Sequence, residues 1–325
     1  MSFVRITGIG SYSPEKVLSN QDIEKIVDTS DEWIVTRTGI KERRIATDAE
    51  ASSDMGIVAA QQAVKEANVS PEDIDAIIVA TVTPDYLFPS TACILQSKLK
   101  AKKATAFDIL AGCSGFLYAI HIARDMIDSG RCKTVLAVGV ETLSKVVDYQ
   151  DRSTCILFGD GAGAAVLQKS ETPGVLSSQL GSDGDNWNLL YMPGGGSRIP
   201  ATEQSVKDRS HFLKMEGNEV FKEAVKAMET ASEQAVKLAG LEPENIDLFI
   251  PHQANSRIIE ATRKRMNFPE EKVVVNLDKY GNTSSASIPI ALHEALKEGR
   301  ICEGSTVLLA AFGAGFTWGS CVVRL

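Results

Sequence analysis

The stretch Ala106–Arg124, AFDILAGCSGFLYAIHIAR, joins a short apolar run to a helical pattern through a turn rich in small residues. Residues 106–110 have the length and composition of a buried strand, and apolar residues recur at helical spacing over residues 116–127. The helix is predicted to end at Gly130, because glycine is favoured just past a helix C-terminus. Cys113 is therefore expected between the end of a strand and the first turn of a helix.

This position of Cys113 favours a reactive thiol. The unpaired N–H groups at a helix start carry partial positive charge, which favours a thiolate over a thiol. Gly112 and Gly115 flank the turn, and they allow another backbone or a substrate to come close. The alternative is a buried structural thiol, since free cysteine is among the most buried residue types. We favour the reactive interpretation.

The composition is that of an ordinary globular protein. The 325 residues are 44% hydrophobic and 23% charged, and they are enough for two domains or one double-sized one. The net charge of −8 argues against a nucleic-acid-binding protein. No apolar run is long enough to cross a membrane, and the N-terminus lacks the features of a signal peptide, so a cytoplasmic location is expected. The six cysteines form no metal-like grouping.

Strand and helix patterns alternate along the whole chain. The expected strands cover residues 2–10, 75–81, 106–110, 134–140, part of 155–167, 246–250, 273–276 and a pair near 310–320. The expected helices cover residues 20–27, 52–68, 92–99, 116–127, 218–238 and 288–296. This alternation predicts an α/β protein.

The two halves of the chain resemble each other. The segment leading to Asp75 matches the one leading to Asp247, an offset of 172 residues, and Arg131 matches Arg300 at an offset of 169. The second offset places Asn282 opposite Cys113, so both residues are expected at the same strand-to-helix turn. We therefore predict two duplicated units, residues 1–172 with the cysteine and residues 173–325, that converge on one site.

A second candidate functional residue is His252, which directly follows an apolar strand pattern. Working residues of α/β folds lie at such strand ends; the alternative is a satisfied core histidine. His121, His211 and His293 are expected to be structural or at the surface. Cys113, His252 and Asn282 would then combine a nucleophile with two hydrogen-bond donors, as in a Cys-His-Asn hydrolase or in a site that stabilises an enolate.

Several long motifs carry a family resemblance. The segments DILAGCSGF, FGDGAGAAVL, HQANSRI, GNTSSAS and FGAGFTWGS resemble those of the β-ketoacyl-acyl-carrier-protein synthase III enzymes of the thiolase superfamily, in the same order and over essentially the whole chain. The resemblance implies a thiolase-like fold with duplicated halves in a five-layered αβαβα sandwich, and a homodimer.

The resemblance also implies a reaction. Cys113 would take an acyl group from acyl-CoA, with acetyl-CoA as the expected primer. His252 and Asn282 would stabilise the enolate formed when malonyl-acyl-carrier protein loses CO₂, and this enolate would attack acyl-Cys113. Related elongating enzymes use two histidines, so Asn282 favours the initiating class. The N–H groups of Cys113 and Ala314 would form the oxyanion hole, although the family more usually has glycine at position 314.

The remaining implied roles concern binding, with CoA as a substrate and with no metal or redox cofactor. The implied CoA contacts are Thr29, Trp33, Arg37, Arg152, Gly217 and Asn255. Phe88 would close the acyl pocket of a partner subunit. Lys222 and Arg257 would dock the acidic carrier protein, and we extend this basic patch to Arg263, Lys264 and Arg265.

Three alternatives stay open at this point. A polyketide or secondary-metabolite starter synthase would share the fold and the three residues. A Cys-His-Asn acyl hydrolase would release free acid. A protein that binds CoA or a carrier without turnover would not need the intact set of Cys113, His252 and Asn282.

Overall fold

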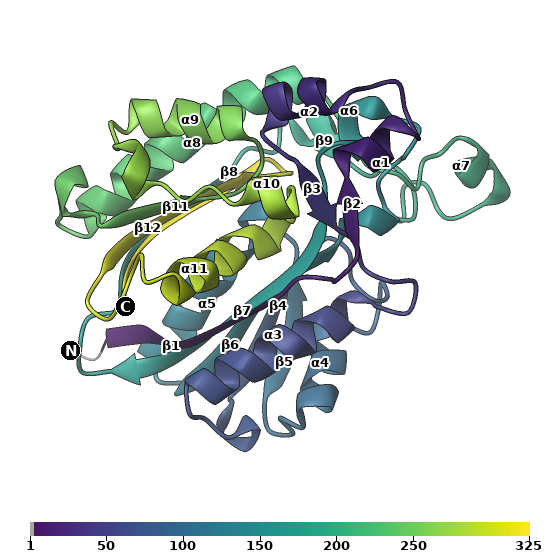
Figure 1. Cartoon of the computed structure of the whole chain (residues 1–325). Coiled ribbons are helices and arrows are strands. Elements are labelled where there is room, and N and C mark those ends of the chain that lie inside the picture. Colours follow the sequence, from purple (N-terminus) through teal and green to yellow (C-terminus); the bar gives the residue numbers. More distant parts are fainter. Residues whose placement is uncertain (1–2) are drawn as a thin grey trace.

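Two β-sheets with a layer of helices between them make up the computed structural model, which describes residues 3–325 (Figure 1). The first sheet has the strand order β1 (Phe3–Tyr12), β7 (Asp160–Ser170), β6 (Thr134–Thr142), β4 (Ala76–Ala80) and β5 (Thr105–Ile109). In it β4 runs parallel to β5 and β6, and β7 runs antiparallel to β1 and β6. The second sheet has the order β11 (Leu248–Pro251), β12 (Thr306–Gly313), β13 (Thr317–Arg324) and β8 (Val175–Ser182).

Helices cover both faces of each sheet. Two of them, α5 (Gly115–Asp128) and α11 (Ser287–Lys297), lie between the sheets and contact strands of both. The outer face of the first sheet carries α3 (Ser52–Glu66) and α4 (Thr91–Leu99), and that of the second carries α8 (Gly217–Leu238), packed in turn against α9 (Ser256–Arg265). The predicted five-layered αβαβα sandwich is therefore confirmed.

The burial of each helix follows from its layer. The central helix α11 is enclosed on two sides, and eight of its 11 residues are buried. The outer helix α8 buries a single stripe that includes Val220, Ala224, Met228 and Ala235, whose spacing of four or seven residues places them on one face. Its other face carries the charged residues.

The sequence match between the two halves corresponds to a shared local structure. The Asp75 carboxylate accepts hydrogen bonds from the N–H groups of Lys133 and Thr134 at 2.6 and 3.0 Å, which ties the start of β4 to that of β6. In the same way, Asp247 accepts a hydrogen bond from the N–H of Thr306 at 2.8 Å, at the start of β11 and β12. Each aspartate thus connects the starts of two parallel strands by hydrogen bonds.

The predicted pairing of Cys113 with Asn282 is wrong by three residues. A short 3₁₀ turn, residues 112–114, leads into α5, and its counterpart, residues 284–286, leads into α11. The first residue of each turn has a positive φ, 52° at Gly112 and 47° at Ser284. The sequence offset between the two halves is therefore 172 residues at these turns. It falls to 169 residues only after the helices, because α5 has 14 residues and α11 has 11. The counterpart of Cys113 is Ser285.

Two other expectations need correction. The predicted strand at residues 273–276 is a single bridge between Phe249 and Val273, because the chain turns directly into α10 (Leu277–Tyr280). The first expected helix is only α1 (Asn20–Glu24). The segment after it forms α2 (Asp31–Thr38) and β3 (Glu42–Arg44), which pairs with β2 (Val17–Ser19).

The remaining helices and strands are short. They are α6 (Arg152–Cys155), α7 (Glu203–Lys207), β9 (Leu190–Tyr191) and β10 (Lys214–Met215). In Figure 1, α7 projects away from the layers on a long loop. The predicted division at residues 172 and 173 falls in the turn between β7 and β8, and it stays a prediction. Among residues 3–325, no helix is both long and apolar enough to cross a membrane.

Candidate active site

Cys113 lies on the turn between β5 and α5, where two chain segments come very close. A Cβ atom added at Gly112 would lie 2.6 Å from the Ala314 nitrogen, and one added at Gly313 would lie 2.3 Å from the Cys113 nitrogen. Glycine is therefore required at both positions, and it brings the N–H groups of Cys113 and Ala314 to one place. Neither N–H donates to a backbone carbonyl within the described chain. Ala314 does not have a positive φ, so alanine fits there without backbone strain.

His252 directly follows β11, as the sequence predicts. Its backbone N–H donates to the Ala310 carbonyl at 2.7 Å, and its ring Nδ1 lies 2.6 Å from the Ser287 hydroxyl oxygen. The Gln253 N–H approaches the same hydroxyl oxygen at 3.5 Å, and we assign the Ser287 proton to the contact with Nδ1. The remaining ring proton then sits on Nε2, which can act as a hydrogen-bond donor.

The imidazole of His252 is neutral. Its residue is 2% exposed, and burial lowers the pKa of His252 to about 3 because a charged ring loses its hydration there. A neutral ring can donate one hydrogen bond from Nε2 without carrying a charge.

Asn282 is held by both its backbone and its side chain. Its N–H donates to the Leu157 carbonyl at 2.8 Å, and its carbonyl accepts from Gly159 at 3.0 Å. The side-chain Oδ1 accepts from the Ser284 N–H at 2.9 Å. This contact leaves the Nδ2 amide hydrogens as free donors in the described structure.

The three residues converge on one cavity of about 250 Å³. Cys113, His252 and Asn282 all line it, and so do four of the other predicted site residues, which are Arg37, Gly217, Asn255 and Arg257. The rest of the wall is mainly apolar and comes largely from α8 and from the chain around α6: Ile156, Leu157, Phe158, Leu190, Met215, Val220, Phe221, Ala224, Met228 and Phe312. An apolar cavity with a few convergent polar groups is typical of a small-molecule site.

Burial at Cys113 works against the thiolate that the helix start was expected to favour. Desolvation raises the pKa of the Cys113 thiol to about 12, and the Glu141 carboxylate adds to this effect, whereas a contact with the Ser284 hydroxyl opposes it. The resting group is therefore a thiol, and its proton has to be removed when the sulfur attacks.

Three predicted nucleotide contacts, Thr29, Trp33 and Arg152, do not line the cavity. The Arg152 guanidinium lies over the Trp33 ring at 4.9 Å and donates to the Asp28 carbonyl at 3.0 Å. A flat base stacked between the two would need about 7 Å, twice the usual contact distance. Arg152 would thus have to swing outward. The Thr29 hydroxyl is buried and has no hydrogen-bond partner in residues 3–325.

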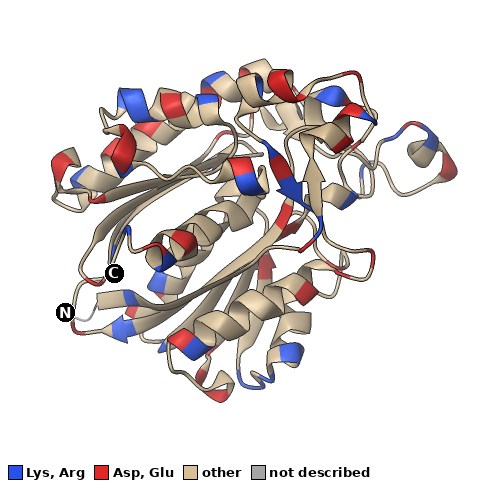
Figure 2. Ribbon diagram, viewed as in Figure 1, with Lys and Arg blue, Asp and Glu red and all other residues tan. Residues whose placement is uncertain are grey.

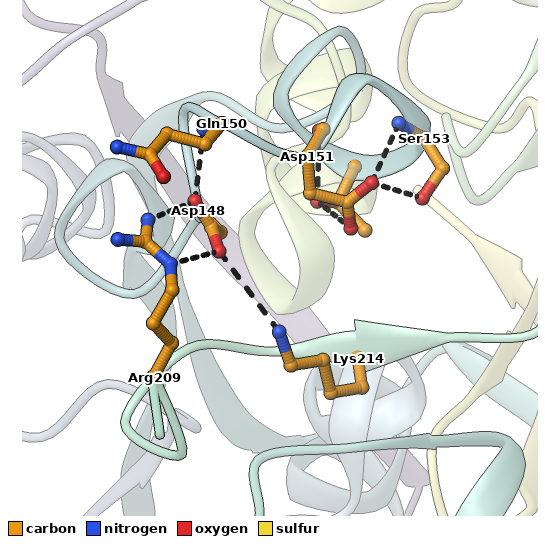
Figure 3. A network of polar contacts seen from close by, with 7 residues as sticks. Asp148, Gln150, Asp151, Ser153, Arg209 and Lys214 are labelled. Atoms are coloured by element: carbon orange, nitrogen blue, oxygen red, sulfur yellow. Dashed lines mark hydrogen bonds and ion pairs between the residues drawn. The ribbon is translucent and has the colours of Figure 1, made fainter. Parts of the chain in front are cut away.

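A polar network holds the segment that carries Arg152 (Figure 3). Asp151 caps α6 by accepting hydrogen bonds from the Ser153 N–H and hydroxyl at 2.9 and 2.6 Å. Nearby, the Asp148 side chain is 5% exposed and pairs with Arg209 and, at 3.9 Å, with Lys214. These contacts join the α6 segment to the strand that leads into the cavity wall at Met215.

The predicted carrier-protein residues differ in their pairing. Lys222 is paired with Glu219 at 2.8 Å, whereas Arg257 lies over the Phe221 ring at 5.5 Å and has no acidic partner in the described chain. Our extension of the basic patch is weaker than expected, because Arg263, Lys264 and Arg265 all pair with glutamates. Figure 2 shows acidic and basic residues interspersed along α8 and α9.

The remaining candidates lie away from the cavity. Phe88 is 87% exposed and does not line it. His121 contacts Ser178, His293 contacts Ser11 at 2.7 Å, and His211 packs on Phe212, all of which are structural contacts as expected. In residues 3–325, no group of three or more potential metal ligands is gathered.

Comparisons with known proteins identify the family. A model of 3-oxoacyl-[acyl-carrier-protein] synthase III matches residues 107–184, and a model of its C-terminal part matches residues 236–325. The β-ketoacyl-[acyl-carrier-protein] synthase III of Caldanaerobacter subterraneus subsp. tengcongensis is 57% identical over 98% of this chain and 97% of its own length. The chain belongs to the 3-oxoacyl-[acyl-carrier-protein] synthase III family. It is therefore an acyltransferase, a condensing enzyme that initiates fatty acid synthesis.

Solved structures agree with this assignment. The 3-oxoacyl-[acyl-carrier-protein] synthase III of Aquifex aeolicus VF5 superimposes with a TM-score of 0.92 at 51% identity, covering 99% of this chain and 100% of that one. The priming β-ketosynthase of the R1128 polyketide pathway gives a TM-score of 0.93 at 38% identity, covering 99% and 96%. The predicted family, fold and enzyme class are confirmed.

Sequence reasoning missed three residues of this synthase III site: Glu141, Ser284 and Ser287. The two serines lie inside the motif GNTSSAS, where only Asn282 was given a role. Glu141 lies near the end of the apolar strand β6, and a position at a strand end had already singled out His252. The same argument could have found it.

Proposed function

We propose that this chain condenses an acyl-CoA primer, with acetyl-CoA as the expected one, with malonyl-acyl-carrier protein through an acyl-Cys113 intermediate. The convergence of Cys113, His252 and Asn282 on one apolar cavity carries the proposal. The product is a 3-oxoacyl-acyl-carrier protein.

In the first half-reaction the Cys113 sulfur attacks the thioester carbonyl carbon of acyl-CoA. Negative charge develops on the carbonyl oxygen, and the N–H groups of Cys113 and Ala314 are available to stabilise it. The tetrahedral intermediate then expels the CoA thiolate and leaves acyl-Cys113.

In the second half-reaction malonyl-acyl-carrier protein loses CO₂ in the same cavity. The resulting enolate oxygen takes the place of the thioester carbonyl oxygen, where His252 Nε2–H and Asn282 Nδ2–H serve as donors. Both donors are neutral, because burial keeps His252 unprotonated. The enolate carbon then attacks acyl-Cys113, and the Cys113 thiolate leaves.

The nucleotide end of CoA is proposed to bind at the cavity mouth. There Arg37 and Asn255 line the opening, and Trp33 and Arg152 offer a ring face and a guanidinium for the adenine. The unpartnered Thr29 hydroxyl is a further donor for the nucleotide. Gly217 leaves room beside the pantetheine arm, since a Cβ there would meet only the end of the Met215 side chain, at 3.6 Å.

A homodimer is part of the proposal. The edge strand β5 has no partner on its outer side within residues 3–325, and three exposed apolar side chains follow β4 and β5: Leu87 at 80%, Phe88 at 87% and Leu110 at 79%. Exposed edges and apolar patches of this kind mark association surfaces. A cytoplasmic location and carrier docking on Lys222 and Arg257 remain further parts of the proposal.

The experiment that tests this function is intact mass spectrometry after exposure to acetyl-CoA, with Cys113→Ala beside the unchanged protein. A lasting acetyl adduct on the unchanged protein alone is expected, followed by its loss and by acetoacetyl-carrier protein when malonyl-carrier protein is added. Release of CoA and free acetate without an adduct would favour the hydrolase. A polyketide starter synthase would form adducts faster with longer or branched primers than with acetyl-CoA.

A further inference from the structure

Glu141 is a buried carboxyl group beside the nucleophile, and the mechanism above gives it no role. It lies near the end of β6 and is 0% exposed. Among residues 3–325, no lysine, arginine or histidine side chain forms an ion pair or a hydrogen bond with it. Five hydrogen bonds surround it instead. Its Oε2 accepts from the Val82 N–H and from the hydroxyls of Thr81 and Thr83, and its Oε1 accepts from the hydroxyls of Ser284 and Ser285, at 2.8–3.2 Å.

Ser284 links this carboxyl group to the nucleophile. The 3₁₀ turns at residues 112–114 and 284–286 pack against each other. The Ser284 hydroxyl lies 3.0 Å from Glu141 Oε1, and hydrogen bonding by Ser284 lowers the pKa of the Cys113 thiol. The Ser284 N–H orients the Asn282 amide. Of the three titratable groups Cys113, Glu141 and His252, Cys113 and His252 line the cavity and Glu141 does not.

The backbone conformation at Ser284 is unfavourable for a residue that has a side chain. Ser284 has a φ of 47°, a region in which residues other than glycine are uncommon. The equivalent turn of the first half has glycine at this position, Gly112, with nearly the same φ of 52°. The second half therefore keeps a hydroxyl where the turn itself would favour glycine.

We propose that Glu141 accepts the Cys113 thiol proton through the Ser284 hydroxyl when Cys113 attacks the acyl thioester. The S–H proton moves to Ser284 Oγ while the Ser284 O–H proton moves to Glu141 Oε1, so that a thiol and a carboxylate become a thiolate and a carboxylic acid. The CoA thiolate that leaves takes its proton from water at the cavity mouth. When the condensation step releases the Cys113 thiolate, the relay runs backwards and restores both groups.

The neighbouring Ser285 allows both protonation states of Glu141. Its hydroxyl lies 2.9 Å from Glu141 Oε1 and 2.9 Å from the Ala80 carbonyl. When Glu141 is a carboxylate, Ser285 donates to it. When Glu141 is protonated, Ser285 donates to Ala80 and accepts from the carboxylic acid. The Glu141 carboxyl group thus has a hydrogen-bond partner in both protonation states.

The proposal rests on Cys113 being the acyl acceptor, and the test separates the two. Iodoacetamide alkylates only the thiolate and needs no CoA site, so its rate at Cys113 is followed from pH 6.5 to 8.5 by peptide-resolved mass spectrometry, which excludes the exposed Cys93 and Cys302. In the unchanged protein the rate should be nearly independent of pH, because the proton stays within the Cys113–Glu141 pair. In Glu141→Gln and Ser284→Ala it should rise about tenfold per pH unit and be about 10²-fold lower at pH 7.

Thr81→Val is the matched control, because it removes a hydroxyl donor to the other carboxylate oxygen, Oε2, and leaves the contacts of Ser284 and Oε1 intact, so its profile should stay flat. A flat profile in both Glu141→Gln and Ser284→Ala would overturn the proposal. So would a profile that turns steep only in His252→Ala, since the imidazole would then be the acceptor. If the acetyl adduct forms but the variants show no dependence of alkylation on pH, the proposed function stands and the relay is excluded. If the variants show the pH dependence but no acetyl adduct forms, the relay stands and the proposed function is excluded.

Discussion

The Ser287 hydroxyl lies 2.6 Å from Nδ1 of His252, and with Ser287 assigned as the donor in this contact, Nε2 is the ring nitrogen that can donate into the cavity. Ser287 is the first residue of α11, the helix that lies between the two sheets, whereas His252 directly follows β11, a strand of the second sheet. The position of the imidazole proton thus depends on a residue of α11, whereas the imidazole itself follows β11.

Replacing Ser287 with alanine should therefore slow decarboxylation more than acyl transfer. Without the hydroxyl, Nδ1 loses its partner and the tautomer with Nε2–H is no longer favoured, which should lower the rate of CO₂ release by roughly tenfold or more. The two half-reactions are measured separately, as CoA release from acetyl-CoA and CO₂ release from malonyl-carrier protein. Ser287→Thr keeps the hydroxyl and is the control. An equal loss in both half-reactions would contradict this role.

Burial of His252 should also appear in the pH dependence of stability. Its pKa is lowered from 6.5 to about 3 in the folded protein, so between these values the unfolded chain binds more protons and folding stability falls as the pH falls. From pH 6.5 to 4 this group should remove about 3 kcal/mol of unfolding free energy, at about 1.4 kcal/mol per pH unit. Urea unfolding of the unchanged protein and of His252→Gln at several pH values measures it.

The quantity to follow with pH is the difference in unfolding free energy between the unchanged protein and His252→Gln. His293, whose pKa burial also lowers, to about 4, is present in both and cancels. The unchanged protein should lose its stability advantage over His252→Gln progressively as the pH falls. A difference that stays constant with pH would show that His252 titrates normally.

Arg152 should affect substrates that carry a nucleotide and no others. Its guanidinium lies over Trp33 at 4.9 Å, and an adenine between the two would gain stacking and cation–π contact. Arg152→Ala should therefore raise the KM for acetyl-CoA about fivefold to tenfold and leave reaction with acetyl-pantetheine unchanged. Arg131→Ala, at an exposed position beyond the end of α5, is the control. A similar rise for both substrates would place Arg152 in a structural role.

The active-site residues could be predicted from the sequence because their signals are local. Cys113 and His252 each follow an apolar strand pattern, and the ends of such strands meet at one site in an α/β fold. The predicted pairing of Cys113 with Asn282 failed because it used the offset between Arg131 and Arg300, which both lie after the helices. The helix α5 is three residues longer than α11, so that offset is three residues too small for the turns before the helices.

Long-range contacts could not be predicted in this way. The hydroxyls of Ser284 and Ser285 reach Glu141, more than 140 residues away in the chain, and a sequence gives no indication of which buried carboxyl a serine will meet. Only part of the weakness of the basic patch on α9 has the same cause, because Arg263 and Lys264 pair with Glu260 three and four residues away on one helix, which the sequence alone could have indicated. Its cations are visible in the sequence, but the pairing of Arg265 with Glu229 on α8 depends on how the two helices pack.

Arg257 should contribute more to carrier-protein binding than Lys222. The charge of Lys222 is already partly neutralised by Glu219 at 2.8 Å, whereas Arg257 has no acidic partner within the described residues and lies at the cavity rim. Arg257→Glu should raise the KM for malonyl-carrier protein about tenfold, Lys222→Glu should raise it less, and both effects should shrink with added salt. Acetyl transfer from CoA is the internal control. Equal effects at high and low salt would contradict electrostatic docking.

Phe88 should influence primer choice through the partner subunit. It is 87% exposed and does not line the cavity of its own chain, so any effect on the acyl pocket has to act across an interface. Phe88→Ala is expected to shift the preference from acetyl-CoA toward longer primers, because a large ring no longer closes the pocket. Initial rates with acetyl-, butyryl- and hexanoyl-CoA measure this shift, and light scattering reports whether the dimer persists.

The control for Phe88 is Leu238→Ala, which removes an apolar side chain that is 62% exposed at the end of α8, away from the edge strand β5. It should change neither primer preference nor mass in solution. If Phe88→Ala remains dimeric with the primer preference of the unchanged protein, Phe88 of the partner subunit does not form the end of the pocket. If it becomes monomeric, the exposed patch beside β5 is the association surface, and the lost ring acts through assembly.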